Sequence, residues 1–295
     1  MFDRIFANYL AECGKLSDQN LKDIFAIQDS KRVRLGVIAV SEKLMTIEQV
    51  EEVNQLQAVL DKRFGDIAIE KGYLNNEQVG RLLVLQGNSY LAFVQSVVDG
   101  GYLSIDEIEH MMTKYQEENN FTLSNMEDLK SCDINRVIPI FLYSQPEMLR
   151  ELASVIIRTT VRVVDFHTFI KKPSVISEYP YEAICAQSIG GDHRFFTGIS
   201  GNASNALKDV AVAFAGSDNI SCDEDVVDAL CELVNCVNGL YASDMSNRSV
   251  DIDMDAPVGK LEPGTLKAGK ILCIPTVVCG KQIDLLLTMD QDFTL

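Results

Sequence analysis

A repeat of 29 residues occupies the first 116 residues of the chain. A helix-ending position recurs at this interval, at Gly14, Lys43, Gly72 and Gly101. Three positions after each of these stands a residue that caps helix N-termini well, at Ser17, Thr46, Asn75 and Ser104. Glycine readily adopts the positive φ that ends a helix, so each repeat is predicted to be a short helix, a turn and a longer helix. A unit this small cannot bury its apolar face alone, and we expect the repeats to stack on one another.

The second and third repeats are the most alike. The segments 34–57 and 63–86 each begin with Arg, an apolar residue and Gly, and each ends in Gln. This pair resembles the tandem motif of the domain at the N-terminus of MshE-type and type II secretion ATPases, some members of which bind cyclic di-GMP. The resemblance implies a nucleotide site at Arg34, Leu35, Gly36, Gln57, Arg63, Gly65 and Gln86. An arginine can fork onto a phosphate, and a neighbouring glycine lets a ligand approach the backbone.

The same repeats also fit a helical scaffold that docks a protein partner. The chain departs from the motif at Phe64, where the family has Leu, and at Lys43, where the family has Gly. The Arg and Gln positions could equally cap helices and bind neighbouring loops. Both interpretations, a cyclic di-GMP module and a docking scaffold, are open at this point.

Composition limits the partners and the location of the protein. With 295 residues, 47% of them hydrophobic, the chain is long enough for two domains with buried cores. A net charge of −17 disfavours nucleic acid as a partner. We expect no signal peptide and no membrane span, because the start lacks a basic segment and no run of 18 apolar residues exists. The eight cysteines form no C-x-x-C pair, which favours reduced thiols in the cytoplasm, and the three scattered histidines favour no metal site.

The second half of the chain has an α+β pattern. We predict helices over 146–162, 202–215 and 224–242, a hairpin of strands 183–189 and 195–199, and closing strands over 249–254, 270–277 and 282–289. The domain boundaries that follow are a repeat domain over 1–116, a polar linker over 117–145 with one helical turn, and a second domain over 146–295. Within the linker, the apolar segment 136–146 is interrupted by Pro139 and is expected to be too short and kinked for a free helix.

The helix predicted over 224–242 carries a narrow polar stripe. At about 100° per residue, Asp228, Glu232, Asn235 and Gly239 fall within about 60° of one another. Leu230, Leu233 and Val237 fall on the opposite face, as expected of a helix that buries one side. Such a stripe is usually only a solvated surface. Asn and Gly are poor helix formers, however, and their presence favours a functional role for this one.

The order of these residues resembles the signature of the CheC, CheX and FliY phosphatases. That signature is an acidic or Ser residue, Glu four positions later and Asn three positions after the Glu, with a further Gly common in CheX-like members. The resemblance implies that Glu232 and Asn235 are the catalytic pair, with Asp228 and Gly239 as partner contacts. The implied substrate is the aspartyl phosphate of a CheY-like response regulator, which itself supplies Mg²⁺ and a lysine.

By this resemblance, Asn235 of this chain would orient the attacking water and Glu232 would pair with the regulator's lysine. Gly239 would leave space for the partner. No cofactor of the chain's own is implied beyond the cyclic di-GMP of the repeats. CheX-type domains also often pair through their sheets, so a homodimer is a further expectation. The alternative function is a signalling adaptor that binds a receiver domain without turnover. In either case the repeats would regulate or localise the second domain.

Overall fold

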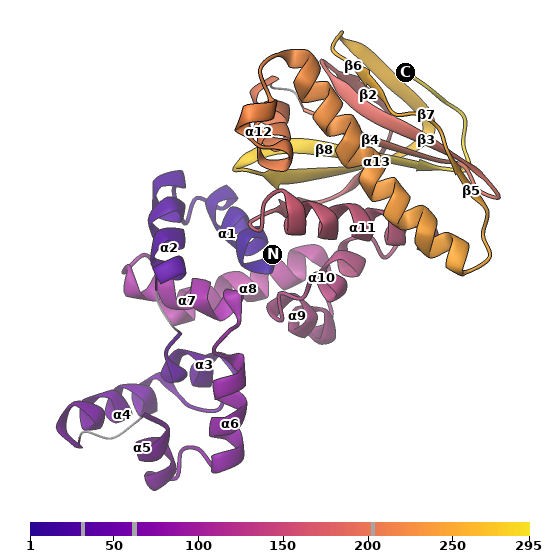
Figure 1. The fold of residues 1–295 in the computed structure, drawn as a ribbon. Coiled ribbons are helices and arrows are strands. Elements are labelled where there is room, and N and C mark those ends of the chain that lie inside the picture. The colour runs from indigo at the N-terminus through magenta and orange to yellow at the C-terminus, as the bar shows by residue number, and fades with distance from the viewer. Residues whose placement is uncertain (31–32, 61–63, 202–203) are drawn as a thin grey trace. The chain divides into compact units, whose positions relative to one another are not determined.

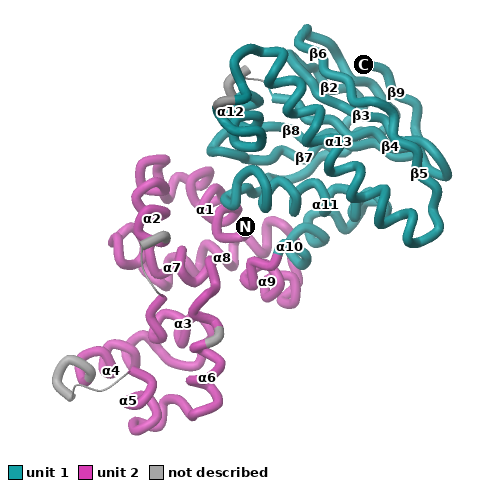
Figure 2. The backbone as a smooth tube through the Cα atoms, in the orientation of Figure 1, with its two compact units in different colours: residues 1, 134–295 teal, residues 2–133 magenta. Residues whose placement is uncertain are grey.

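A computed structural model describes the chain apart from residues 31–32, 61–63 and 202–203 (Figure 1). The chain divides into two compact units, one of residues 2–133 and one of residues 134–295 together with Met1 (Figure 2). We call them the repeat unit and the sheet unit and describe each by itself. In the part of the chain that is described, no helix has both the length and the apolar character needed to cross a membrane.

The repeat unit is helical along its whole length. Its helices are α1 (Phe2–Glu12), α2 (Asp18–Ser30), α3 (Leu35–Ser41), α4 (Ile47–Leu60), α5 (Phe64–Glu70), α6 (Asn76–Leu85), α7 (Ser89–Asp99), α8 (Ile105–Asn119) and α9 (Leu123–Lys130). The first eight of these form four pairs, each a shorter helix, a turn and a second helix. The predicted repeat architecture is therefore present in the structure.

The turn inside each repeat has the predicted backbone conformation. The φ angles are 69° at Gly14, 55° at Lys43, 74° at Gly72 and 68° at Gly101. Lys43 adopts this conformation although a side chain disfavours it by about 1–2 kcal/mol. The predicted N-cap of α6 is also present. The backbone N–H of Gln78 donates to Asn75 Oδ1 over 2.8 Å, and the backbone N–H of Asn75 donates to Gln78 Oε1 over 2.8 Å.

The repeats do not all stack in sequence order. Helices α1 and α2 of the first repeat pack on α7 of the fourth, and α3 of the second repeat packs on α6 of the third. An aromatic cluster joins the first and fourth repeats, and the Phe6 ring lies 6.0–6.5 Å, measured between ring centroids, from Tyr90, Phe93 and Tyr115. Large aromatic surfaces on α1, α7 and α8 explain this pairing, since they bury most area against one another.

The segment expected to be a linker is largely helical. Thr122 and Asn125 form a capping box that begins α9, and Met126 and Leu129 are buried on its inner face. Residues 134–141 form a further helix, α10 (Ile134–Phe141), with Pro139 inside it. The expectation of a single helical turn in the linker is therefore wrong, whereas the segment around Pro139 is, as expected, no free helix, because it packs on its neighbours. Val137, Ile138 and Ile140 are buried, and α10 packs on α11 of the sheet unit, so tertiary packing compensates for the proline.

After α10, the sheet unit has one helix before the predicted hairpin, and a second helix and then a long third helix follow it. After α11 (Glu147–Val163) come β1 (Phe169–Ile170), β2 (Ser174–Tyr181), β3 (Ile184–Gly191), β4 (Phe195–Ser200), α12 (Ser204–Ala215), a 3-10 turn (Ser217–Asn219) and α13 (Asp223–Asn247). The remaining strands are β5 (Ile252–Met254), β6 (Val258–Lys260), β7 (Gly264–Val278), β8 (Lys281–Met289) and β9 (Phe293–Thr294). The α+β prediction is confirmed.

Within the described residues, the strands form one antiparallel sheet in the order β1-β7-β8-β4-β3-β5, with β2 and β9 also paired to β7 and β6 to β3. The predicted hairpin is β3 and β4, which pair from Ile184 with Ser200 to Ile189 with Phe195. Strands β1, β2, β6 and β9 were not predicted. In β2 most side chains are exposed and a proline lies near its end, so burial alternates only at Tyr179 and Tyr181, which is too short a pattern to predict a strand.

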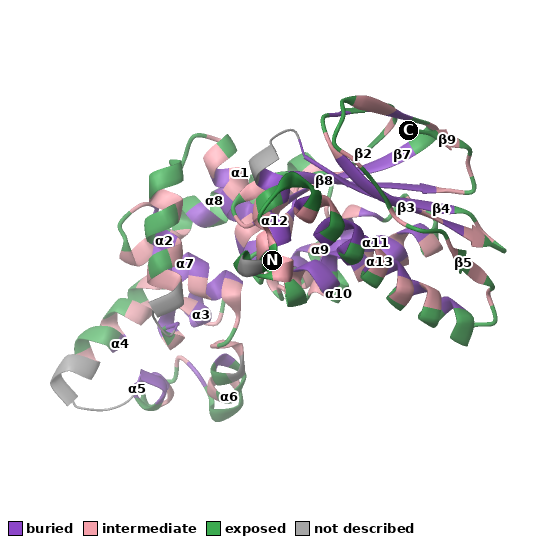
Figure 3. Cartoon of the chain, turned by 45° about the horizontal axis from the view of Figure 1, so that its top comes forward, coloured by how far each residue is buried: buried purple, intermediate pink, exposed green. Residues whose placement is uncertain are grey.

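The two faces of the sheet bury different clusters. Helix α13 crosses one face with α11 and α12 beside it, and its Tyr241 ring packs against Phe195 with 5.6 Å between centroids (Figure 1). Phe196, the next residue of β4, lies on the other face in a core with Tyr179, Leu266 and Ile271. The central strands β3, β4 and β8 are therefore buried along most of their length (Figure 3).

Candidate functional site

The stripe identified in the sequence lies on the outer side of α13. Asp228 and Glu232 are exposed, whereas Asn235 and Gly239 are half-buried at the border of the helix's packed face. Leu230, Leu233 and Val237 are buried on the opposite side, as the helical spacing predicts. The half-burial of Asn235 differs from the expectation of an exposed side chain. It arises because the amide turns towards β3.

The Asn235 side chain accepts a hydrogen bond from a glutamine of the sheet. Gln187 on β3 donates from Nε2 to Asn235 Oδ1 over 2.9 Å and to the backbone carbonyl of Asp255 over 2.7 Å. Asn238, one turn along α13, donates from Nδ2 to Gln187 Oε1 over 2.8 Å. Thr197 on β4 donates its hydroxyl to Asn238 Oδ1 over 3.1 Å. The helix and the two central strands are thus joined by one line of hydrogen bonds that ends at Asn235.

Sequence reasoning missed Gln187, Asn238 and Thr197. All three are buried, with exposed fractions of 2%, 0% and 2%. A signal was present, because Gln187 stands among apolar residues in a strand and Asn238 in the apolar part of a helix. Polar side chains at such positions are nearly always hydrogen-bonded to one another. The sequence does not show which residue each of them would meet.

The two carboxylates of the stripe are free of the rest of the described chain. Neither Asp228 nor Glu232 has a hydrogen bond or ion pair within the described residues, and both side chains face outward. Two exposed carboxylates one turn apart form a small negative surface. Such a surface attracts a cationic side chain of a partner.

Gly239 leaves open space on the same side of the helix. A Cβ built at this position would meet no heavy atom within 4 Å. The glycine is therefore not required by packing inside the chain, although it lowers helix stability by about 1 kcal/mol relative to alanine. By contrast, Gly259 on β6 is required, because a Cβ there would overlap the Val227 side chain of α13.

The start of α13 is held by an ionised carboxylate. Asp225 accepts from the Ser221 hydroxyl over 2.6 Å and from the backbone N–H groups of Ser221 and Cys222 over 2.8 and 3.0 Å. These bonds, the Ser221 hydroxyl foremost, hold the pKa of Asp225 well below its usual range. A negative charge at a helix N-terminus is favourable, so this cap fixes where the stripe begins.

The buried thiol of Cys185, beside the stripe, is not suited to nucleophilic chemistry. Contact with the Cys231 thiol, and then burial, raises the pKa of Cys185 above its ordinary value. The reactive form of a cysteine is the thiolate, and Cys185 is therefore a neutral packing group at pH 7. Among the described residues, no three His, Cys, Asp or Glu side chains gather into a metal site.

In the repeat unit, the residues predicted to bind a nucleotide contact other parts of the chain. A Cβ at Gly36 would lie 2.6 Å from Val50 Cγ1, and one at Gly65 would lie 2.9 Å from Val79 Cγ1. Both glycines therefore allow close packing of the two helices of their repeat. Leu35 is half-buried beside Gly36.

The polar members of that set are also bonded within the unit. Arg34 forms an ion pair with Asp99, and Gln86 donates from Nε2 to the carbonyl of Val33 over 2.7 Å. Arg63 and the side chain of Gln57 lie outside the described residues. The described members are therefore explained by contacts within and between repeats of this unit.

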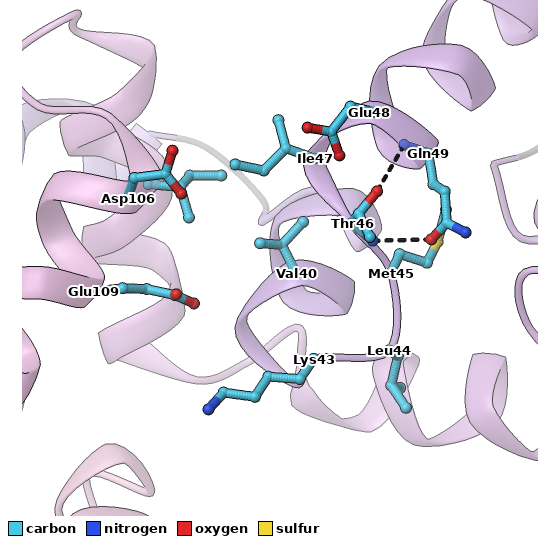
Figure 4. A pocket seen from close by; sticks show the side chains of 11 residues that line it. Val40, Lys43, Leu44, Met45, Thr46, Ile47, Glu48, Gln49, Asp106 and Glu109 are labelled. Carbon is cyan, nitrogen blue, oxygen red and sulfur yellow. Dashed lines mark hydrogen bonds between the residues drawn. The ribbon is translucent and has the colours of Figure 1, made fainter.

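A cavity of about 470 Å³ lies elsewhere in the repeat unit, between the turn that joins α3 to α4 and the start of α8. Figure 4 shows Asp106 and Glu109 on one side of it and Lys43, Thr46 and Glu48 on the other. Three carboxylates against one lysine disfavour a phosphate ligand by charge. None of the residues predicted for cyclic di-GMP lines this cavity.

Comparison with solved structures gives likenesses that cover about half of this chain. No protein-family model and no curated protein matches the sequence. A chemotaxis protein CheX from Desulfovibrio desulfuricans matches with 13% identity and a TM-score of 0.43, over 49% of this chain and 99% of that one. CheX from Vibrio vulnificus matches with 16% identity and a TM-score of 0.42, over 49% and 99%. A CheX–CheY–BeF3–Mg²⁺ complex from Borrelia burgdorferi matches with 16% identity and a TM-score of 0.38, over 48% and 97%.

Proposed function

We propose that the sheet unit removes the phosphoryl group from the aspartyl phosphate of a CheY-like receiver, with Glu232 and Asn235 as the acting pair. The observation that carries the proposal is the arrangement on α13. A free carboxylate and a firmly held amide stand one turn apart on an outward stripe, beside a glycine with open space over it. Their order along the helix resembles the signature of the CheC, CheX and FliY phosphatases.

The reaction requires few catalytic groups from the phosphatase itself. A water molecule attacks phosphorus, the bond from phosphorus to the aspartyl oxygen breaks, and the products are a free carboxylate and inorganic phosphate. Catalysis of phosphoryl transfer is largely positioning and electrostatic stabilisation. The receiver supplies Mg²⁺ and a lysine in this scheme. The chain then needs only a hydrogen-bonding group that holds the water, and Asn235 is suited to this task.

Glu232 is suited to docking. Its carboxylate is exposed and unpaired within the described residues, so it is available to a lysine of the receiver without first breaking a bond of its own. The open space over Gly239 would admit the receiver's backbone close to the helix. Asp228, one turn before Glu232, would contribute charge at the rim.

The alternative is a signalling adaptor that binds a receiver without turnover. The exposed carboxylates and the open glycine fit this function equally well, whereas the fixed amide of Asn235 favours the enzyme. A single-turnover assay on a phosphorylated CheY-type receiver separates the two. Faster loss of acyl phosphate indicates an enzyme, and complex formation with unchanged decay indicates an adaptor.

For the repeat unit we propose a regulatory or localising role as a docking scaffold. The glycines, Arg34 and Gln86 of its paired motif are all used in contacts within the unit. Cyclic di-GMP binding stays a prediction, which calorimetry with the full chain would test. A homodimer through the sheet unit likewise stays a prediction, to be tested by light scattering over a range of concentrations.

A further inference from the structure

The direction of the hydrogen bonds below Asn235 follows from one backbone group. The carbonyl oxygen of Asp255 can only accept, so the end of Gln187 that lies 2.7 Å from it is the NH₂ group. The same Nε2 lies 2.9 Å from the side chain of Asn235. The atom of Asn235 that faces it is therefore the acceptor, Oδ1, and Nδ2 lies on the other side of the amide.

The other end of Gln187 is fixed in the same sense. Its Oε1 accepts from Asn238 Nδ2 over 2.8 Å, and Asn238 Oδ1 accepts from the Thr197 hydroxyl over 3.1 Å. The amides of Gln187 and Asn238 thus form hydrogen bonds through both their nitrogen and their oxygen, and both side chains are buried. Reversing any one amide would place donor against donor or acceptor against acceptor, which is costly in a buried network.

We infer that Gln187 is a positioning residue, which holds Asn235 so that its Nδ2 donors point outward. This inference rests on the proposed function and specifies the partner group. The group that meets Asn235 must offer an oxygen lone pair, as the attacking water or a phosphoryl oxygen does. A fixed donor needs no reorganisation when the substrate arrives, which is how preorganised hydrogen bonds accelerate reactions.

Gln187→Glu reverses the pattern with almost no change in shape. At neutral pH the carboxylate only accepts, so it loses the bond to the Asp255 carbonyl. Asn238 can still donate to it, but Asn235 must turn its Nδ2 inward. The outward group of Asn235 then becomes Oδ1. We expect the rate of phosphate loss at saturating phosphatase to fall by about 10- to 100-fold, with receiver affinity unchanged because Glu232 is untouched.

The pH dependence of this variant has a defined sign. Burial raises the pKa of a carboxyl group, so the introduced glutamic acid regains its proton in mildly acidic solution. Below that pKa the acid can donate to Asn235 Oδ1 again, and the rate should rise as the pH falls. The recovery should be partial, since one proton cannot serve both Asn235 and Asp255. The wild type would not show this rise, and the amide NMR readout separates it from a structural defect caused by the buried charge.

NMR of the side-chain amide protons reports the orientation of Asn235 independently of catalytic activity. In the wild-type chain the Asn235 side-chain protons should exchange freely with water, while those of Gln187 and Asn238 should be protected. In Gln187→Glu the Asn235 protons should become protected at neutral pH. Gln187→Met, which keeps the bulk and cannot become charged, should leave Asn235 without a fixed orientation and lower the rate at every pH.

The control is Gln291→Glu, which makes the same charge change at a residue whose Oε1 accepts from the backbone N–H of Lys270. It should change neither readout. Full activity of Gln187→Glu with freely exchanging Asn235 protons would overturn the inference, as would protected Asn235 protons in the wild type. If the NMR pattern holds but the wild-type chain accelerates no phosphate loss, the positioning stands and the proposed function fails.

Discussion

The Nε2 atom of Gln187 on β3 lies 2.9 Å from Oδ1 of Asn235 on α13. This bond joins the sheet to the outward stripe of the helix and sets which end of the Asn235 amide faces away from the sheet. The stripe is therefore more than a solvated surface, because one of its members is held by a buried polar network.

Asn235→Ala should remove the acceleration of receiver dephosphorylation, by about 100-fold or more, because the group that holds the water is lost. The fold should remain, with a loss of about 1 kcal/mol in the free energy of unfolding from the missing hydrogen bond to Gln187. Asn247→Ala is the matched control, since Asn247 is an exposed asparagine at the end of the same helix. Equal losses of activity in both variants would argue against a specific role for Asn235.

Glu232→Ala should weaken receiver binding by several-fold to about 10-fold and should reduce its salt dependence, because an exposed charge pair is lost. The rate at saturating phosphatase should change little. Titration of a phosphorylated or beryllofluoride-loaded receiver at two salt concentrations measures this. Glu262→Ala removes an exposed carboxylate from the loop after β6 and should have no effect. Unchanged affinity in Glu232→Ala would rule out the docking role.

Gly239→Ala should have opposite effects on stability and on binding. The free energy of unfolding should rise by about 1 kcal/mol, since alanine favours the helix and the new Cβ meets nothing within 4 Å. Receiver affinity should fall, because the methyl group occupies the space that a partner would use. Thermal denaturation and the binding titration together test this. A variant that is more stable and binds normally would show that Gly239 is not at the interface.

Gly36→Ala should destabilise the repeat unit by about 1–3 kcal/mol, because the new Cβ would lie 2.6 Å from Val50 Cγ1. Gly80→Ala is the control within α6, where an added Cβ meets nothing, and it should stabilise by about 1 kcal/mol. Chemical denaturation of both variants gives the comparison. If Gly36→Ala were as stable as wild type, the packing explanation for this motif glycine would fail.

Local features of the fold were predictable from sequence, and long-range pairings were not. The turns at Gly72 and Gly101 and the caps at Asn75 and Ser104 depend on neighbouring residues, so the 29-residue period predicts them. The packing of the first repeat on the fourth depends on which aromatic faces meet in space. The period alone does not encode that choice.

The candidate site likewise has a part that the sequence predicts and a part that it does not. Helical spacing predicts that Glu232 and Asn235 share a stripe, because both lie on one helix. The partner of Asn235 is 48 residues earlier in the chain, on β3. Only the register of β3 beneath α13 brings Gln187 to it, and that register is a property of the folded sheet.

The most direct test of the central claim is single-turnover decay of the acyl phosphate on a CheY-type receiver, with and without the full-length chain. The account predicts that wild-type protein shortens the phosphate lifetime and that Asn235→Ala, at a concentration that saturates the receiver, leaves the lifetime at its intrinsic value. A wild-type chain that binds the phosphorylated receiver without changing that lifetime would contradict the claim.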